Sequence, residues 1–161
     1  MDFERRLEQA IDRGQKSRDA RNKAEQQRTL SEEELRNLHS AARLNLSDYA
    51  ETLLRKLSDH FPGFRFETVV GDEGWGARIN RDDLSLGRGT RTSQYSRFQI
   101  LVRPFSPTAK IVEVVAKATI RNKEALNRTH FQFLTDFNED GFREVVDLWV
   151  LEFAEQYSAS N

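Results

Sequence analysis

Oxygen-bearing side chains alternate along one short run near the C-terminus, Asp136-Phe137-Asn138-Glu139-Asp140-Gly141. Four residues fit positions one, three, five and twelve of a calcium-binding loop: Asp136, Asn138, Asp140 and Asp147. Gly141 falls where such loops bend sharply. Hard oxygen ligands at this spacing suit Ca²⁺, because the ion takes several oxygens from one short loop. One interpretation of the run is therefore a calcium site.

The start of a helix explains the same run. Phe142 is in phase with the apolar residues that follow it, so a helix is expected to be formed by residue 142. Asn138 is then the N-cap, and the two acidic residues after it complement the helix dipole. Asp147 is shorter than the usual bidentate glutamate, and the charge of Arg143 opposes a cation. We favour the helix start and predict neither a metal nor another cofactor.

The centre of the chain is rich in arginine. Every basic residue from Arg65 to Arg103 is arginine, seven in all. Five of them are candidate ligands for an anion or a partner: Arg78, Arg81, Arg88, Arg91 and Arg97. Guanidinium groups bind carboxylates and phosphates through paired hydrogen bonds. The segment 78–103 therefore predicts a site for nucleic acid or another anionic ligand.

Aromatic residues near these arginines are expected to add stacking, namely Trp75, Tyr95 and Phe98. The alternative explanation of the arginine-rich segment is a mobile hairpin loop. Its arginines would then be solvated and would discourage aggregation through strand edges. The formal net charge of the whole chain is −1, which gives no bulk attraction to polyanions. Nucleic acid is therefore possible but not favoured as a partner.

Composition also excludes several kinds of chemistry. The chain has no cysteine, so disulfides, thiol nucleophiles and thiolate zinc sites are absent. The N-terminus lacks the apolar core of a signal peptide, and no apolar run reaches membrane-spanning length. We therefore expect a soluble, cytoplasmic protein that has no membrane contact.

Motifs for catalysis are missing. The three histidines, His39, His60 and His130, share no metal-ligand spacing, and no nucleophile-elbow motif is present. A non-enzymatic protein is therefore the leading expectation. The alternative is an enzyme or ligand-binding domain with a pocket between its sheet and its C-terminal helix.

Residues 1–29 predict a polar helical arm. Apart from a short stripe at Phe3, Leu7 and Ile11 the segment offers little apolar surface, so a helix there is marginal without a partner. Ser31 and Glu34 form a capping-box pattern at the start of a second helix, which ends before Pro62. We expect a protein partner or self-association through residues 1–60.

Residues 64–135 change to the alternation of strands. Expected strands lie near 64–70, 75–79, 95–103, 109–121 and 129–133, with a loop at 82–94 and a final helix at 142–157. Short connections favour an antiparallel meander of four to five strands. Residues 30–161 thus predict a single α+β domain, with two N-terminal helices in the chain and one C-terminal helix packed on the sheet. The leading functional interpretation is an adaptor or oligomerising module.

Overall fold

The computed structural model describes residues 2–87 and 90–160, excluding the side chains of 25–31 and 84–92. The elements are α1 (Asp2–His60), β1 (Arg65–Gly71), β2 (Gly74–Gly87), β3 (Thr90–Val102), β4 (Ile111–Ile120), β5 (Lys123–Phe133), the 3-10 turn η1 (Leu134–Asp136) and α2 (Glu139–Ala159). The chain divides into two compact units, residues 1–37 and 38–161. Within the described part of the chain, each helix is too short or too polar to cross a bilayer.

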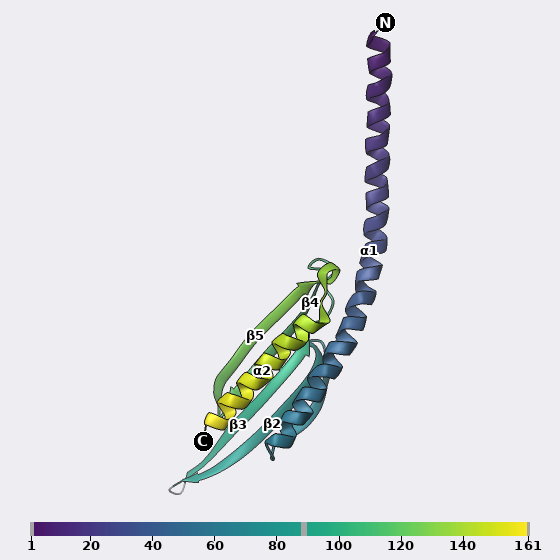
Figure 1. The fold of residues 1–161 in the computed structure, drawn as a ribbon. Helices are drawn as coiled ribbons and strands as arrows, with labels where there is room; N and C mark the ends of the chain where they lie inside the picture. The colour runs from purple at the N-terminus through teal and green to yellow at the C-terminus, as the bar shows by residue number, and fades with distance from the viewer. Residues whose placement is uncertain (1, 88–89, 161) are drawn as a thin grey trace. The chain divides into compact units, whose positions relative to one another are not determined.

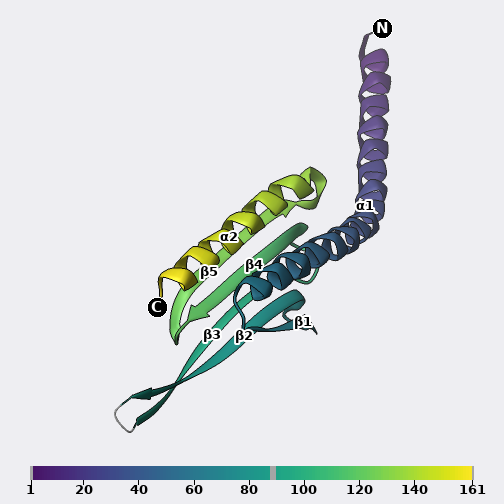
Figure 2. The same ribbon diagram turned by 60° about the horizontal axis from the view of Figure 1, so that its bottom comes forward.

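The predicted α+β class is confirmed. Both N-terminal segments that were expected to be helical fall within α1. The five strands form one sheet in the order β1-β2-β3-β4-β5, and every neighbouring pair is antiparallel. In the second unit, α2 and residues 38–60 of α1 lie on the same side of this sheet (Figures 1 and 2). Among the described residues of this unit, no helix lies over the other side of the sheet.

The core lies between the sheet and the two helices. Alternate residues of the strands point toward the helices, and Ile79 and Phe98 are fully buried there. The ring of Phe98 stacks on that of Phe153 with 4.5 Å between centroids. Phe142 and Leu54, from α2 and α1, are also fully buried. Large side chains thus fill the space between sheet and α2, and the alternative of a ligand pocket there is left without support.

The start of α2 agrees with the helix interpretation of the acidic run. The Oδ1 atom of Asn138 accepts a hydrogen bond from the backbone N–H of Gly141 at 3.3 Å, which confirms the predicted N-cap. The backbone N–H of Asn138 donates to Gln132 Oε1 at 2.7 Å. Asp136 lies in η1 and Asp140 in the first turn of α2. Among described residues, no three His, Asp or Glu side chains are grouped to hold a metal.

Asp147 has a different partner. Its Oδ1 atom accepts a hydrogen bond from the hydroxyl of Tyr49 on α1. Burial, followed by this hydrogen bond, raises the pKa of Tyr49 to about 12, so the hydroxyl stays protonated and donates. The guanidinium group of Arg143 lies 4.6 Å from the centroid of the Tyr49 ring. Asp147 therefore joins α2 to α1.

The expected loop at 82–94 is wrong. The β2–β3 ladder continues through this segment, with Asp83 opposite Gln94 and Gly87 opposite Thr90. Antiparallel pairing uses backbone groups, so a polar segment can extend a ladder beyond the core where no hydrophobic alternation marks it. The capping-box contact of Ser31 lies outside the described side chains.

Candidate anion-binding site

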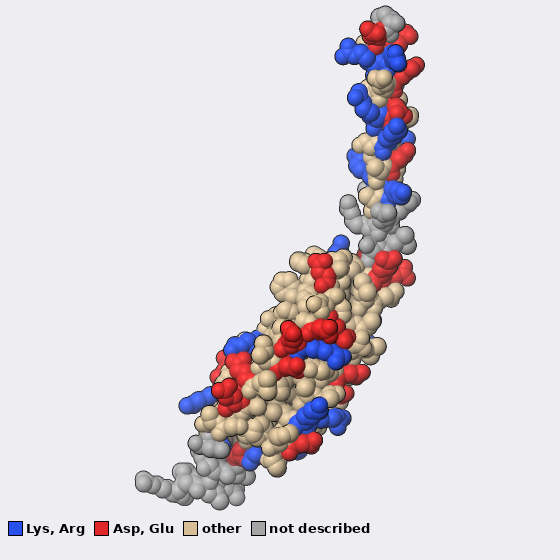
Figure 3. Space-filling view, in the orientation of Figure 1, with Lys and Arg blue, Asp and Glu red and all other residues tan. Residues whose placement is uncertain are grey.

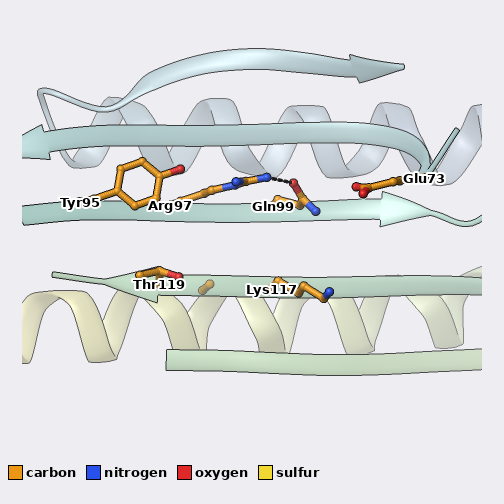
Figure 4. A pocket seen from close by; sticks show the side chains of 7 residues that line it. Glu73, Tyr95, Arg97, Gln99, Lys117 and Thr119 are labelled. Atoms are coloured by element: carbon orange, nitrogen blue, oxygen red, sulfur yellow. Dashed lines mark hydrogen bonds between the residues drawn. The ribbon is translucent and has the colours of Figure 1, made fainter. Parts of the chain in front are cut away.

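Polar residues from four strands gather on the face of the sheet that the helices leave open. The register sets Arg78 opposite Gln99, Gln99 opposite Lys117, and Arg97 opposite Thr119. Figure 4 views part of this face, with the helices behind the strands. We call the following set the polar sheet face: Glu67, Arg78, Asn80, Tyr95, Arg97, Gln99, Lys117 and Thr119. It forms because alternate residues of a strand share one face.

Gln99 is the centre of the polar sheet face. Its Oε1 atom accepts hydrogen bonds from Arg78, at 3.1 Å from Nε and 2.9 Å from Nη2. The same oxygen accepts a third from Nη2 of Arg97 at 2.7 Å. Gln99 is only 6% exposed, so both guanidinium groups are held against a fixed partner. An amide oxygen carries no net charge, and the positive charges of the two arginines are therefore not neutralised by it.

The two arginines differ in what balances them. Nη1 of Arg78 lies 3.3 Å from Oε1 of Glu67, which forms an ion pair. Arg97 and Lys117 have no such partner: no carboxylate among the described side chains lies within 4.0 Å of either charged group. These neighbouring residues of β3 and β4 are thus the cations of the face that have no paired acid.

A shallow depression of about 310 Å³ surrounds them (Figure 4). It is lined by Glu73, Tyr95, Arg97, Gln99, Lys117, Ala118 and Thr119. A second depression of about 490 Å³ lies over Arg78 and Glu67, and Tyr95 lines both. The phenol of Tyr95 donates to Asn80 Oδ1 at 3.1 Å, which fixes the ring between the two hollows. The first hollow has room for one carboxylate or phosphate group and its water.

The structure brings together two of the five arginines singled out in the sequence. Arg78 and Arg97 share Gln99, whereas Arg81 belongs to the opposite side of β2. There Arg81 donates to Asp83 Oδ1 and to the Pro62 carbonyl, both at 2.8 Å, and the bond to Asp83 raises the pKa of Arg81. Arg88 lies outside the described residues, as does the side chain of Arg91.

The side of the sheet on which each aromatic residue lies corrects the expected stacking of Trp75, Tyr95 and Phe98 near the arginines. Tyr95 lies on the polar sheet face, but Phe98 is buried against Phe153. Trp75 is also occupied elsewhere, because the guanidinium carbon of Arg43 on α1 lies 4.4 Å from its ring centroid. The prediction that Trp75 and Phe98 add stacking at the arginine-rich site is therefore wrong.

Sequence reasoning missed Gln99 and Lys117. A signal existed for each, since Gln99 lies two residues from Arg97 along a strand and Lys117 interrupts a run of small and apolar residues in β4. Their contribution to the site depends on the register between strands, which cannot be read from the sequence.

Comparison of the chain with protein-family models, with curated proteins and with solved structures gives no match. Inference about function therefore rests on the polar sheet face and on the surfaces of the two units.

Proposed function

We propose that the protein is a non-enzymatic binding module that holds an oxyanion of its partner, a carboxylate or a phosphate, on the polar sheet face. The observation that supports this most is the pair Arg97 and Lys117, which lie at diagonal positions of β3 and β4, line one hollow and have no acidic partner among the described side chains. Anion binding through segment 78–103 was one of the functions expected from the sequence, and Lys117 extends it to β4.

Preorganisation makes this pair suited to an anion. Arg97 is already oriented by Gln99, so its side chain loses little freedom on binding. Its guanidinium group offers further N–H donors for a bidentate contact, and Lys117 adds a compact positive charge. The hydroxyl of Thr119 is a further donor at the edge of the same hollow.

Nearby acids favour one anionic group over a polyanion. Glu73 lines the same hollow, and Glu67 and Asp82 line the adjacent one. A strand of nucleic acid crossing the face would bring its regularly spaced phosphates close to these carboxylates. A protein segment that presents one carboxylate, or a single phosphate group, avoids that repulsion.

The proposal is tested by titrating the full chain with three probes: inorganic phosphate, a short peptide that carries a single glutamate and a single-stranded oligonucleotide. We expect the phosphate or the peptide to bind, and Arg97→Ala and Lys117→Ala each to weaken binding by about tenfold, as loss of one charge-assisted hydrogen bond does. Calorimetry or NMR shift perturbation measures this. Lys110→Ala is the matched control, because Lys110 lies seven residues before Lys117, roughly 23 Å along an extended strand.

Three outcomes contradict the proposal. Failure of phosphate and peptide to bind would remove it, and so would an equal loss in Lys110→Ala. Binding of the oligonucleotide alone, with steep salt dependence, would instead establish the nucleic-acid alternative.

A second candidate function is protein contact through the N-terminal arm, here residues 2–24 of α1. Every residue of this segment is exposed, including the stripe of Phe3 (65%), Leu7 (47%) and Ile11 (52%). A helix that is polar on its other sides and buries no apolar face gains little stability alone. Burial of this stripe against a partner or a second copy would supply what the arm lacks.

A further inference from the structure

The hollow over Arg97 and Lys117 is also lined by a carboxylate. Glu73 reaches it from the short turn that joins β1 to β2. Figure 4 shows the side chain of Glu73 directed along the sheet toward Gln99, on the same side of the strands as the two cations. The hollow therefore presents charges of both signs, two positive charges from β3 and β4 and one negative charge from the turn.

Glu73 has no cation of its own. Among the described side chains, no Lys, Arg or His nitrogen lies within 4.0 Å of its carboxylate. Arg103 contacts the backbone of Glu73 instead, because its Nη1 donates to the Glu73 carbonyl at 3.0 Å. Nε of Arg103 lies 3.8 Å from Oε1 of Glu113. Arg103 thus holds the turn in place but leaves the carboxylate of Glu73 available to a ligand.

Two ion pairs of α2 show a different arrangement of opposite charges in the same unit. Nη2 of Arg128 lies 2.6 Å from Oε1 of Glu152, and Nη2 of Arg143 lies 3.1 Å from Oε2 of Glu139. Figure 3 shows the helix side of this unit, where basic groups lie against acidic ones. In the hollow, by contrast, the opposite charges lie apart around a space of about 310 Å³. A ligand that carries both charges would complement them.

We propose that the partner held on the polar sheet face is a small amino acid, whose carboxylate binds Arg97 and Lys117 and whose ammonium group binds Glu73. This assignment rests on the proposed function and narrows the ligand from a single oxyanion to a zwitterion. An ammonium group has three N–H donors for the carboxylate of Glu73. The space of about 310 Å³ equals about ten water molecules at ~30 Å³ each, which is room for a small amino acid.

Glu73 gives the hollow a preference among anions. Its charge repels a plain carboxylate or phosphate that binds beside Arg97, whereas it attracts the ammonium group of an amino acid. The side chain of Glu73 is exposed, so solvent screens this attraction. We therefore expect a modest preference of about threefold, as an exposed ion pair supplies.

Pairs of ligands that differ only in the ammonium group test this inference: acetate with glycine, propionate with β-alanine, and butyrate with γ-aminobutyrate. Each is titrated into the full chain, and the NMR shifts of the β3 and β4 amides give the affinity. We expect at least one amino acid, the one whose charge spacing matches the hollow, to bind about threefold more tightly than its plain carboxylate. In Glu73→Gln that amino acid should bind more weakly and the plain carboxylate more tightly.

Asp72→Asn is the matched control. Asp72 is the neighbour of Glu73 in the turn and is also exposed, but it does not line the hollow. This variant removes the same charge and should keep the preference for the amino acid. Opposite changes for the two ligands in Glu73→Gln separate recognition from a structural role, because a distorted hollow would weaken both.

Equal affinities within all three pairs overturn the inference, and the anion-binding proposal then stands if phosphate or the glutamate peptide binds. A preference that survives Glu73→Gln, or that is lost equally in Asp72→Asn, also overturns the inference. If none of the six ligands binds, the inference fails, and the anion-binding proposal fails with it when phosphate and the peptide do not bind either.

Discussion

At the scale of single residues, His39 links the fold to pH. Its ring is almost fully buried, its Nε2–H donates to the carbonyl of Arg103 at 3.1 Å, and its edge meets the ring of Phe105 at 5.5 Å between centroids. Burial lowers the pKa of His39; the bond to Arg103 opposes this and the charge of Arg43 adds to it. His39 is therefore neutral in the folded chain at neutral pH.

The sign of the pH effect follows. Below about pH 6.5 the unfolded chain protonates His39 whereas the folded chain resists, so the free energy of unfolding falls as pH falls, by up to about 1.4 kcal/mol per pH unit. Stability from this residue is complete above pH 6.5 and is lost toward the lower, folded pKa. We expect His39→Gln to flatten the slope measured by urea unfolding between about pH 5 and 6.5. An unchanged slope, or an equal flattening in His60→Gln, contradicts this assignment.

Residues of the candidate site show what the sequence reveals and what it does not. Arginine enrichment pointed to Arg78 and Arg97, because the residue type itself carries the chemistry. It also pointed to Arg81, which faces the other way because it lies an odd number of residues from Arg78. Gln99 and Lys117 join the site only through the register of three strands. The sequence thus revealed which residue types could bind an anion, but not which side chains the fold brings together.

At the scale of elements, Gly76 shows how closely β2 and β3 approach. A Cβ atom at this position would lie 1.9 Å from the carbonyl oxygen of Ile100, a backbone atom that cannot rotate away. We expect Gly76→Ala to destabilise the fold by about 2 kcal/mol or more, as overpacking in a closed site does. Gly71→Ala is the control, because nothing lies within 4 Å of the corresponding Cβ. Equal melting temperatures for the two variants contradict the expected clash.

Elements were predictable where an apolar face marks them. The strand near Ala77 and Ile79 and the helix after Asn138 were both located because buried residues repeat at the strand and helix periods. The outer part of the β2–β3 hairpin was missed because polar residues such as Asp83 and Gln94 give no apolar alternation in the sequence, although their backbones pair. Hydrophobic patterning cannot detect a ladder that is formed by polar residues.

At the scale of the whole molecule, the arm raises the question of what it contacts. Its charge divides along its length: residues 2–12 contain four acidic and two basic residues, and residues 13–24 contain five basic residues against Asp19. An antiparallel pair of arms would set each acidic part beside a basic part and would bury the stripe of Phe3, Leu7 and Ile11. A parallel pair would bring like charges together.

The arm is therefore expected to associate with the arm of another copy. Replacing Phe3, Leu7 and Ile11 together with glutamine in the full chain should reduce the mass measured by light scattering, while the unfolding midpoint of residues 38–161 stays unchanged. Leu44→Gln, an exposed leucine of α1 in the second unit, is the control. A triple variant with the mass of the parent would show that the arm contacts a different protein or none, because removal of its only large apolar stripe would have cost no association.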